Sequence, residues 1–595
     1  MQLTIIDRWQ RLSQYLEHHQ HARILNIGLK LPSAIRARIK PNLIDAPALI
    51  DKDEFDRKYL NLVADLGHSY QSRFWWGQSI SEKNEFLSSF YQRLFYTYNL
   101  EQFMRRGAFG ELLVLCADYE LISYWRKVYP GRIKIQVPNL NLWILRKKCQ
   151  NYLRLLCKSV LFSLREIYRS WICRFYLAKR FQEIKARKYL LAIKTVMDHR
   201  NYSTGTYRDS YFGPLINYLN TQNIETFLVT EILQRYRDGV GKLAKEKKYN
   251  ILPLEIFTSI KDVAKTLWES LTCGVNMKKE VFFEGIDITA LLRYELDQYS
   301  ANAQFYVNLL SYHKLLAVLR HIQFEKYLYT FENYGWEKLG IMCLRKHKPQ
   351  VRITAFQHAF ISKNSFRYFP GAREGQIMPL PDKIVTMGKI TKEILEKFGD
   401  YSTTQLIEGC ALRQEKTVNL PRIPRTGKKD IFVPLTITVE DTVKVLNFLC
   451  EAGLGNSTFS IFLRFHPITP RKKVFAQIDF SLPKNFIISD GVSLEEEFKR
   501  SGVVLYTWTT VCLEALLVGL PVIYLDINYP LNVDPLFDLP YLKRTVSKAE
   551  ELLDEISALL ALNQERYEQE YHQSRKYIEQ YFYPVTAQNL KVFVE

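Results

Sequence analysis

Short apolar runs of strand character alternate with helical stretches along most of the chain. The first series comprises the runs 112–116, 133–137, 190–196, 226–230, 327–331 and 351–356. A second series begins near residue 382 and reads KIVTM, TQLIE, DIFVP, SIFLRF, NFIIS, GVVLY and PVIYL, again with helical patterns between the runs. Continuous apolar strands separated by helices are typical of parallel sheets covered on both faces. The pattern predicts an α/β fold with two doubly wound, Rossmann-like domains that face a cleft.

The division between the two series predicts the domain boundaries. Residues 1–110 look mainly helical, and residues 111–370 carry the first series of strands. The stretch 362–381 contains Gly, Pro and polar residues, which favour a linker. We therefore expect a second domain over residues 371–595 and a helical insertion over about 141–188 within the first domain. Ligands of such sheets bind beyond the carboxyl ends of the strands, so functional residues should directly follow the apolar runs.

The composition of the 595 residues excludes several classes of protein. Hydrophobic residues make up 47% and charged residues 24% of the chain, which argues against a disordered, a collagen-like or a polytopic membrane protein. Nine cysteines, an odd number without a C-x-x-C pair, argue against a disulfide framework and a thiolate metal site. The charged N-terminal segment lacks the apolar core of a signal peptide, and no apolar stretch approaches the roughly 18 residues of a membrane span. We expect a cytoplasmic protein.

Positive charge is concentrated in one segment. The formal net charge is +20, and residues 146–188 carry thirteen Lys or Arg against only Glu166 and Glu183. The segment contains neither Gly nor Pro, which predicts one or two long helices. A basic helix with Trp, Phe and Leu suits the interface of an anionic membrane, here the inner face of the plasma membrane. The alternative is a solvated helical face; a nucleic-acid partner is not expected, because no recognised nucleic-acid motif accompanies the segment.

The segment 506–526 predicts a phosphate-binding turn. A strand ends at Tyr506, Thr509 or Thr510 is placed to cap the helix that follows, and Gly519 ends that helix. The amide groups and the positive end of such a helix bind phosphate. Glu514, one turn further on, is placed to accept hydrogen bonds from ribose hydroxyls. The alternative is that the threonines only cap the helix and that Glu514 is solvated.

Other strand ends carry candidates for nucleotide contacts. His466 and Pro467 directly follow a strand of the same domain, where the imidazole would contact a phosphate and the proline would stop the strand. Gly388 follows another strand and admits the close approach of a ligand, with Lys389 at the start of the next helix. Arg413 follows the next strand along the chain. As alternatives, the glycine belongs to a turn and the bases lie on the surface.

These residues resemble a known family. Gly388, the His466-Pro467 pair and the pattern Thr-Thr-x-x-x-Glu-Ala-x-x-x-Gly-x-Pro-Val over 509–522 are similar to the nucleotide-binding domain of GT-B glycosyltransferases of bacterial surface polysaccharides. The likeness is greatest to Kdo and sialic acid transferases, which carry a His-Pro motif and use CMP-activated sugars. Four further motifs resemble a surface carbohydrate biosynthesis family: FWWGQSISEKN, YRDSYFG, TFENYGWEKLG and AFQHA. Two residues depart from the pattern, Ala359 in place of a glycine and Trp508 in place of a small hydroxyl residue.

The resemblance implies a GT-B-like fold with the donor nucleotide in the C-terminal domain, the acceptor glycan in the N-terminal domain, and transfer in the cleft without a bound metal or a cofactor. Such transfer needs a base or a nucleophile. Asp209, in the loop after the strand 190–196, is the favoured catalytic carboxylate, and Glu332, directly after the strand 327–331, is the other candidate. Gln357 and His358 end a further strand and are candidates for contacts to phosphate or acceptor, as is Arg208. As alternatives, Asp209 caps a helix and Glu332 pairs with a nearby base.

The leading hypothesis is a glycosyltransferase that extends a lipid-linked surface polysaccharide from a nucleotide sugar, with CMP-Kdo or a related acid sugar as the candidate donor. A CDP-glycerol-type phosphotransferase of the same fold is the first alternative. A non-catalytic scaffold that binds nucleotide or glycan in a polysaccharide assembly complex is the second, and Ala359 and Trp508 favour it.

Overall fold

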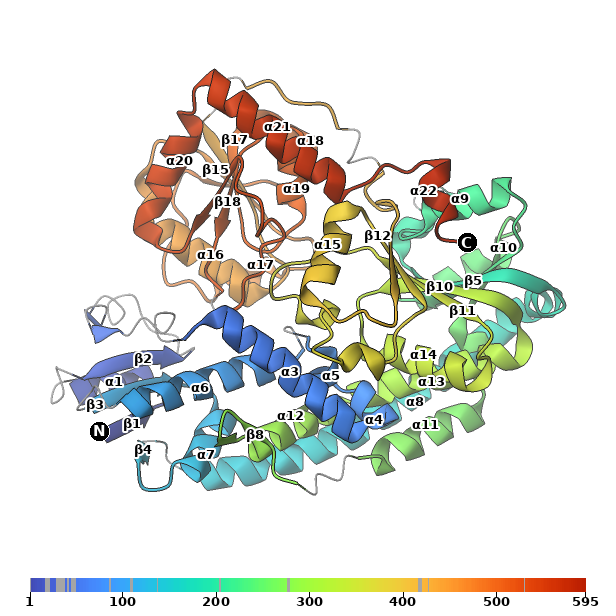
Figure 1. The fold of residues 1–595 in the computed structure, drawn as a ribbon, viewed down its shortest axis with the longest axis horizontal. Helices are drawn as coiled ribbons and strands as arrows, with labels where there is room; N and C mark the ends of the chain where they lie inside the picture. The colour runs from blue at the N-terminus through green and yellow to red at the C-terminus, as the bar shows by residue number, and fades with distance from the viewer. Residues whose placement is uncertain are drawn as a thin grey trace.

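Three parallel sheets, each flanked by helices, make up the protein (Figure 1). The structure is a computed structural model. It describes residues 2–16, 22–27, 38–39, 42–43, 50–84, 87–106, 111–135, 137, 139–202, 205–274, 279–415, 420–425, 427, 429–528 and 530–595. None of the helices in these ranges combines the length and the apolar composition needed to cross a membrane.

The sheet of the N-terminal region has four strands in the order β2-β3-β1-β4. Its strands are β1 (Gln2–Ile6), β2 (Arg23–Ile27), β3 (Glu111–Cys116) and β4 (Ile133–Ile135). The helices α3 (Lys52–Tyr70), α6 (Phe90–Arg106) and α7 (Tyr119–Val128) contribute to the same core as one face of this sheet. The sheet corrects the expectation that the runs near 112 and 133 belong to the acceptor-side domain. The sequence missed β1 and β2 because short apolar runs do not separate strand from helix.

The second sheet has seven parallel strands in the order β13-β12-β11-β10-β5-β6-β7. Its strands are β5 (Lys188–Met197), β6 (Thr226–Ile232), β7 (Asn250–Pro253), β10 (Gln323–Phe331), β11 (Arg352–Gln357), β12 (Lys383–Thr386) and β13 (Gln405–Glu408). The strand order reverses between β5 and β10, and ligands of open α/β sheets bind beyond the carboxyl ends at such a switch point. β12 and β13 were expected in the second domain, so the expected boundary at 371 lies too early.

The third sheet has six parallel strands in the order β16-β15-β14-β17-β18-β19. Its strands are β14 (Asp430–Pro434), β15 (Ile461–Arg464), β16 (Phe486–Ile488), β17 (Ser501–Tyr506), β18 (Val522–Leu525) and β19 (Lys543–Val546). After this sheet, α21 (Gln564–Tyr581) carries the chain back, and α22 (Ala587–Lys591) packs against α9 (Gly213–Thr221) of the seven-stranded domain (Figure 1). Two doubly wound domains joined in this way confirm the predicted GT-B-like α/β fold, to which the four-stranded sheet is added.

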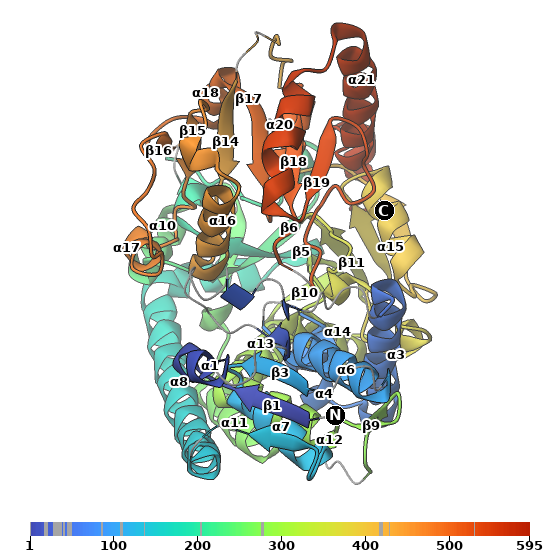
Figure 2. The same cartoon turned by 90° about the vertical axis from the view of Figure 1, so that its left-hand side faces the viewer.

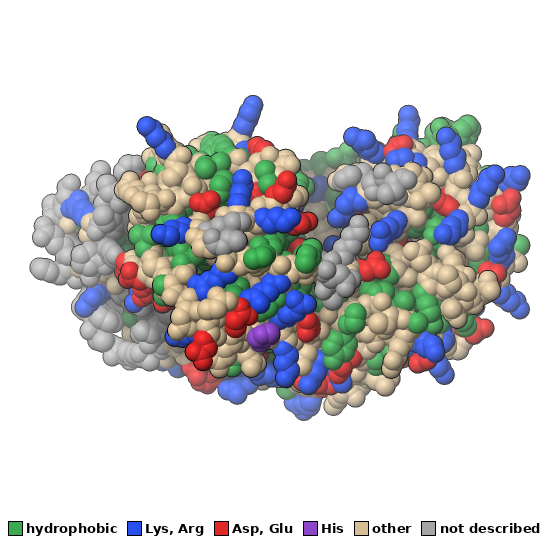
Figure 3. All heavy atoms as spheres, turned by 90° about the horizontal axis from the view of Figure 1, so that it is seen from above, with side chains coloured by type: hydrophobic (Ala, Val, Ile, Leu, Met, Phe, Trp, Pro, Cys, Tyr) green, Lys and Arg blue, Asp and Glu red, His purple; other side chains and the backbone are tan. Residues whose placement is uncertain are grey.

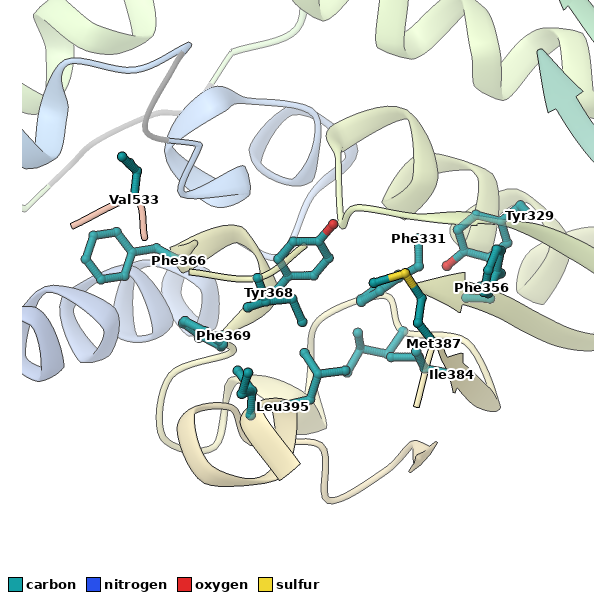
Figure 4. Close-up of a cluster of buried hydrophobic side chains, with 14 of the residues drawn as sticks. Tyr329, Phe331, Phe356, Phe366, Tyr368, Phe369, Ile384, Met387, Leu395 and Val533 are labelled. Atoms are coloured by element: carbon teal, nitrogen blue, oxygen red, sulfur yellow. The ribbon is translucent and has the colours of Figure 1, made fainter. Parts of the chain in front are cut away.

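The expected linker is a packed part of the core. Phe366, Tyr368 and Phe369, which follow β11, are all buried, and Figure 4 shows them between the seven-stranded sheet and Val533 of the six-stranded domain. The Phe398 ring of α15 (Lys389–Phe398) lies 5.4 Å from that of Phe369 in the same domain and 6.0 Å from that of Phe537, which follows the six-stranded sheet's strand 522–525 across the junction. The Gly- and Pro-containing stretch 362–381 is therefore a long loop of one domain and not a linker. Apolar side chains are buried at the junction of the two domains, and their burial stabilises the contact between the domains.

Two of the family-like motifs form a buried ion network. Lys83, in FWWGQSISEKN, pairs with Glu374 at 2.6 Å, and both side chains are fully buried. Glu82 accepts a hydrogen bond from the Gly335 amide of TFENYGWEKLG at 2.6 Å, and Lys338 of that motif donates to a backbone carbonyl beside Glu82. Burial and the charge of Lys83 lower the pKa of Lys338 to about 7. These motifs attach the N-terminal helices to the seven-stranded domain.

The basic segment forms one helix, α8 (Leu140–Lys185), of 46 residues. It runs along the outer side of the molecule beside α7, α10 (Tyr236–Lys245), α11 (Ile260–Thr272) and α12 (Thr289–Ala301) (Figure 2). At 1.5 Å per residue its length is about 70 Å. The prediction of a long basic helix over about 141–188 is confirmed. The helix is not an insertion within the seven-stranded domain, however, because it joins β4 of the four-stranded sheet to β5 of the seven-stranded sheet.

Candidate active site between two parallel sheets

The carboxyl ends of the seven-stranded and six-stranded sheets meet at one place. The loop after β11 and the loop after β18 are joined there, since the Asn532 amide donates to the Asn364 side chain at 2.5 Å and the Asn364 amide donates to the Asn532 carbonyl at 3.3 Å. Seen from above, the surface is hollowed between the two lobes (Figure 3). The loops that follow β11 and β18 therefore meet at the boundary between the two lobes.

A carboxylate and an imidazole lie together on the seven-stranded side. Glu332 directly follows β10 and His358 directly follows β11, and these two strands are neighbours in the sheet. His358 Nε2 lies 3.3 Å from Glu332 Oε1. The Tyr334 hydroxyl donates to Glu332 Oε2 at 2.7 Å, and Arg367 Nη2 lies 3.6 Å from the same oxygen. The parallel strands thus bring the two predicted residues into contact.

The charge of Glu332 is fixed by its neighbours. Burial alone would raise the pKa of Glu332, but the hydrogen bond from His358, the charge of Arg367 and the Tyr334 hydroxyl outweigh burial and hold the pKa at about 2. The carboxylate is therefore ionised at neutral pH. The turn that carries Glu332 is fixed by the buried carboxylate of Glu337, which accepts hydrogen bonds from the backbone amides of Glu332 and Asn333. Asn333 adopts a left-handed backbone conformation, with φ of 61°. This conformation is uncommon in proteins as a whole, and the residues that adopt it cluster at functional sites.

Arg413 and Tyr211 complete this cluster. Arg413 Nη1 lies 3.2 Å from His358 Nδ1. Since a guanidinium can only donate, Nδ1 accepts, and the imidazole proton sits on Nε2 facing Glu332. The Tyr211 ring packs edge-on against His358 with centroids 5.0 Å apart and lies under the Arg413 guanidinium at 4.8 Å. The exposed Arg413 is therefore held by contacts that an anionic ligand could replace.

Asp209 is placed to hold a loop. It is buried, and its two oxygens accept four hydrogen bonds at 2.7 to 2.8 Å: two from the Tyr211 and Phe212 amides, and two from the Thr195 and Tyr207 hydroxyls. Burial raises its pKa, although these four bonds oppose the rise. With all its acceptor positions occupied, Asp209 orients the loop that presents Tyr211 to His358. This geometry gives Asp209 a structural role in its loop, although not the expected helix cap, since Phe212 occupies the N-cap position of α9 without a side-chain cap. Glu332 is then the favoured candidate for the catalytic carboxylate.

The two remaining candidates on this side have protein partners. Gln357 is fully buried; its side-chain amide donates to the Ala359 carbonyl, and its oxygen lies 3.4 Å from the Met387 amide. It therefore stabilises the turn after β11, and Ala359 takes part in that turn through its backbone. Arg208 is exposed and pairs with Glu415 at 3.2 Å. Of the three contact candidates, only His358 lies in the cluster with Glu332.

On the six-stranded side, His466 and Pro467 follow β15 as predicted. The His466 side chain is exposed, and its Nδ1 accepts a long hydrogen bond from the Ile468 amide at 3.4 Å. Nε2 then carries the proton and is the nitrogen available to a ligand. The turn is fixed because the Thr469 hydroxyl donates to the Ile437 carbonyl of the neighbouring loop at 2.9 Å. Burial lowers the pKa of His466, which favours the neutral imidazole.

The predicted helix after β17 is present as α19 (Val511–Leu517). Thr510 occupies the N-cap position without a side-chain cap, while the Thr509 hydroxyl accepts from the Val511 amide at 3.2 Å. Glu514 lies in the first turn of this helix, and burial raises its pKa to about 7 against the opposing charge of Arg464 at the end of β15. Arg464 Nη1 is buried without a hydrogen-bond partner among the described residues. These two strand ends thus bring a carboxyl group and a base together beside His466.

Gly388 and Lys389 do not lie in the six-stranded domain. They follow β12 of the seven-stranded sheet, so their expected place in a nucleotide-binding domain is wrong. A Cβ at Gly388 would lie 2.5 Å from the Gln580 carbonyl oxygen and 2.8 Å from that of Tyr581. The glycine admits the returning chain at the end of α21, and the close approach inferred from the sequence is to the protein's own backbone. Lys389 is exposed and lies 3.6 Å from Glu393.

Sequence reasoning missed four residues of these clusters. Tyr211, Tyr334 and Arg367 surround His358 and Glu332, and Arg464 faces Glu514. Tyr211 and Tyr334 lie in motifs quoted for the resemblance, and Arg464 ends an apolar run two residues before His466, so position relative to a strand end could have identified them. Arg367 lies in the loop taken for a linker and carried no such signal. Among the described residues, no group of His, Cys, Asp and Glu could hold a metal ion.

Comparisons with known proteins show low similarity. No protein-family model matches the chain, and no curated protein matches it at a significant level. Among solved structures, the glycotransferase of kitacinnamycin is 10% identical, covers 68% of this chain and 98% of its own, and gives a TM-score of 0.39. The UDP-GlcNAc 2-epimerase from Neisseria meningitidis, solved with UDP-GlcNAc, is 13% identical, with coverages of 69% and 98% and a TM-score of 0.37. SnogD, a glycosyltransferase from Streptomyces nogalater, is 12% identical, with coverages of 68% and 99% and a TM-score of 0.37. Because these sequence identities and TM-scores are low, the GT-B-like fold is assigned from the strand orders of the seven-stranded and six-stranded sheets.

Proposed function

We propose that the protein is a glycosyltransferase that moves a sugar from a nucleotide sugar to a hydroxyl of an acceptor glycan. The observation that carries this proposal is the Glu332–His358–Arg413 cluster at the switch point of one sheet, with His466, Arg464 and Glu514 at the carboxyl ends of the facing sheet. Base, carboxylate and cationic groups border a single cleft between two doubly wound domains. This is the set of groups that base-assisted transfer from a phosphate-activated donor requires.

The nucleotide is proposed to bind on the six-stranded side. The neutral His466 would donate from Nε2 to a phosphate oxygen, and Arg464 would add positive charge beside it. Glu514 would accept hydrogen bonds from the ribose hydroxyls through its carboxylate. A pKa of about 7 makes that interaction depend on pH near neutrality, with binding stronger as the carboxylate ionises.

The chemical step is proposed to use His358. When the anionic donor takes the guanidinium of Arg413, His358 Nδ1 is released as a base. The acceptor hydroxyl oxygen then attacks the anomeric carbon, the bond from that carbon to the phosphate oxygen breaks, and the hydroxyl proton moves to Nδ1. Glu332, ionised with a pKa of about 2, would hold the opposite ring nitrogen and stabilise the imidazolium that forms. The nucleotide leaves with the bonding electron pair.

The donor and acceptor are proposed by chemical class. Arg413 and Arg367 place two guanidinium groups beside the His358–Glu332 pair, which favours a donor whose sugar carries a carboxylate, such as CMP-Kdo or a related acid sugar. A lipid-linked surface polysaccharide is the proposed acceptor, at the inner face of the plasma membrane. The basic helix α8 supports this location, since such an acceptor is presented at an anionic surface.

The test separates nucleotide binding from turnover. CMP, CDP, UDP and GDP are compared by thermal shift, because a ligand at a hundred times its Kd stabilises the fold by about 2.7 kcal/mol. Release of CMP from a CMP-activated acid sugar measures turnover. Glu332→Gln and His358→Asn should keep the thermal shift and lose turnover by about 10²- to 10⁴-fold. Glu514→Ala should lose the shift.

Lys389→Ala is the matched control, because Lys389 lies outside the cleft clusters, and it should retain both signals. Near-normal turnover in Glu332→Gln and His358→Asn would overturn the proposed chemistry. A shift with CDP and turnover only with a CDP-linked alcohol would assign phosphoalkyl transfer instead. The absence of any nucleotide shift would overturn the donor site.

A further inference from the structure

The long helix α8 turns its apolar side chains outward. Leu161 and Trp171 are each 62% exposed and Phe175 is 71% exposed. The exposed apolar positions 161, 164, 168, 171 and 175 recur every three or four residues, which is the spacing of one helix face. The large apolar side chains exposed on α8 are Leu142, Leu145, Tyr152, Leu153, Val160, Leu161, Leu164, Tyr168, Trp171, Phe175 and Tyr176. This is far more than the scattered apolar residues of an ordinary surface.

The inward face of the middle of the helix is polar. Ser159, Ser163, Glu166 and Ser170 are all buried against the protein. Glu166 pairs with buried Lys314 at 2.6 Å, Ser163 shares a hydrogen bond with a tyrosine hydroxyl at 2.8 Å, and Ser170 donates to a backbone carbonyl at 2.8 Å. These partners fix the rotation of the helix about its axis. Nearer the end of the helix, Ile172, Cys173, Leu177 and Ile184 are buried as well, so α8 packs apolar side chains against the protein and still leaves a second set of apolar side chains exposed on its outward face.

Bases accompany the outward apolar face. Arg154, Arg165 and Lys179 are exposed, and Glu183 is the one acid that α8 exposes. The 13 to 2 excess of bases over acids across 146–188 therefore lies mostly in solvent. Trp268 of the neighbouring α11, which is 70% exposed, adds a further aromatic side chain close to α8.

We propose that the outward face of α8 binds the surface of an anionic lipid bilayer, with the helix lying parallel to the membrane. Apolar and aromatic side chains would enter the boundary between head groups and acyl chains, while the flanking bases pair with lipid phosphates. Charge decides between this occupant and a second copy of the chain, since a two-fold contact through this face would set the bases of both copies against each other. This membrane contact would hold the proposed glycosyltransferase beside a lipid-linked acceptor and in that respect rests on the proposed function. Binding of α8 to the bilayer itself requires neither a nucleotide nor turnover.

The test measures co-sedimentation of the full chain with vesicles of phosphatidylcholine alone and of phosphatidylcholine with an equal amount of phosphatidylglycerol. Salt is varied from about 0.1 M to about 1 M, which shortens the Debye length from about 10 Å to about 3 Å. We expect binding to the anionic vesicles, weakened but not abolished by salt. The triple variant Arg154→Glu, Arg165→Glu, Lys179→Glu should lower the partition coefficient about a hundredfold. The double variant Trp171→Ser, Phe175→Ser should lose the fraction that resists salt.

The controls keep the proposal open to refutation. Lys548→Glu, Arg566→Glu, Lys576→Glu makes the same charge change on the six-stranded domain and should bind like the wild type. Glu332→Gln should also bind normally, so that a failed enzymatic assignment leaves this result unaffected. Equal binding to both vesicle types, or unchanged binding of the α8 triple variant, would overturn the proposal. A concentration-dependent dimer that the Trp171→Ser, Phe175→Ser variant abolishes would overturn it in favour of a second copy.

Discussion

Two substitutions of Asp209 separate a structural role from a catalytic one. Asp209 Oδ1 accepts the amides of Tyr211 and Phe212, and Oδ2 accepts the hydroxyls of Thr195 and Tyr207. In Asp209→Ala both buried amides lose their acceptor, whereas the hydroxyls can rotate. In Asp209→Asn the remaining oxygen serves the amides, and the two hydrogens on nitrogen can be donated to the two hydroxyl oxygens.

The expected magnitudes differ accordingly. An unsatisfied buried amide costs about 1 to 3 kcal/mol, so two of them lower the free energy of local unfolding by about 4 kcal/mol in Asp209→Ala. Asp209→Asn should lose about 1 kcal/mol or less, because every buried group keeps a partner. If Asp209 only holds the loop, Asp209→Asn should also transfer sugar at nearly the normal rate.

Hydrogen exchange measured by mass spectrometry provides the assay. A loss of about 4 kcal/mol corresponds to about a thousandfold faster exchange, at 1.36 kcal/mol per factor of ten. We expect that increase in the peptide covering 205–213 of Asp209→Ala and almost none in Asp209→Asn. Unchanged exchange in Asp209→Ala would refute the account of the loop. A folded Asp209→Asn that loses turnover by orders of magnitude would return the catalytic role to Asp209.

Three further predictions follow from buried or crowded groups. Burial raises the pKa of Glu514 from 4.5 to about 7, so the contribution of this carboxyl group to the free energy of unfolding is complete below about pH 4.5 and is lost as pH rises through 7. In urea unfolding from pH 5 to 8, the free energy of unfolding of the wild type should fall by up to about 3 kcal/mol, whereas that of Glu514→Gln should not. Identical pH profiles would contradict the burial of Glu514. Gly388→Ala puts a Cβ 2.5 Å from a carbonyl of α21 and should lower the melting temperature, while Gly241→Ala, with no atom within 4 Å of its Cβ, should not; equal melting temperatures would contradict the close contact. Lys83→Met leaves the carboxylate of Glu374 buried without its partner and should cost about 3 to 5 kcal/mol in thermal unfolding, and an unchanged transition would show that the pair is not needed.

The local pattern predicted element types well and sheet membership poorly. KIVTM and TQLIE form strands as expected, but both lie in the seven-stranded sheet, where the first (β12) pairs with β11 and the second (β13) pairs with β12. An apolar run shows that a segment is buried on both faces, but which strand lies beside it depends on pairing with residues far along the chain. The Gly- and Pro-containing stretch 362–381 is misleading for the same reason, since its aromatic residues fill the junction between two domains.

The position of candidate residues after a strand was predicted correctly, while their roles in binding and catalysis stay predictions. Glu332, His358 and His466 each follow an apolar run directly, and parallel strands bring such positions to one edge of a sheet. Asp209 also lies in a loop after a strand, but its hydrogen bonds come from Thr195 and from its own loop. No spacing along the chain reveals that all its acceptor positions are taken.

By itself, the sequence determined the α/β character, the helical nature of the basic segment and the strand-end positions, because these depend on hydrophobic periodicity and composition within a few residues. That the basic segment is one helix rather than two was decided by the structure. Only the tertiary structure decided that β1 to β4 form a separate four-stranded sheet, that Gly388 faces the returning α21, and that α8 packs with Ser163 and Glu166 inward and Trp171 outward. Each of these outcomes depends on partners from distant parts of the chain. The buried ion pair of Glu166 with Lys314, more than a hundred residues away, and the hydrogen bonds of Ser163 and Ser170 together fix which face of α8 meets solvent.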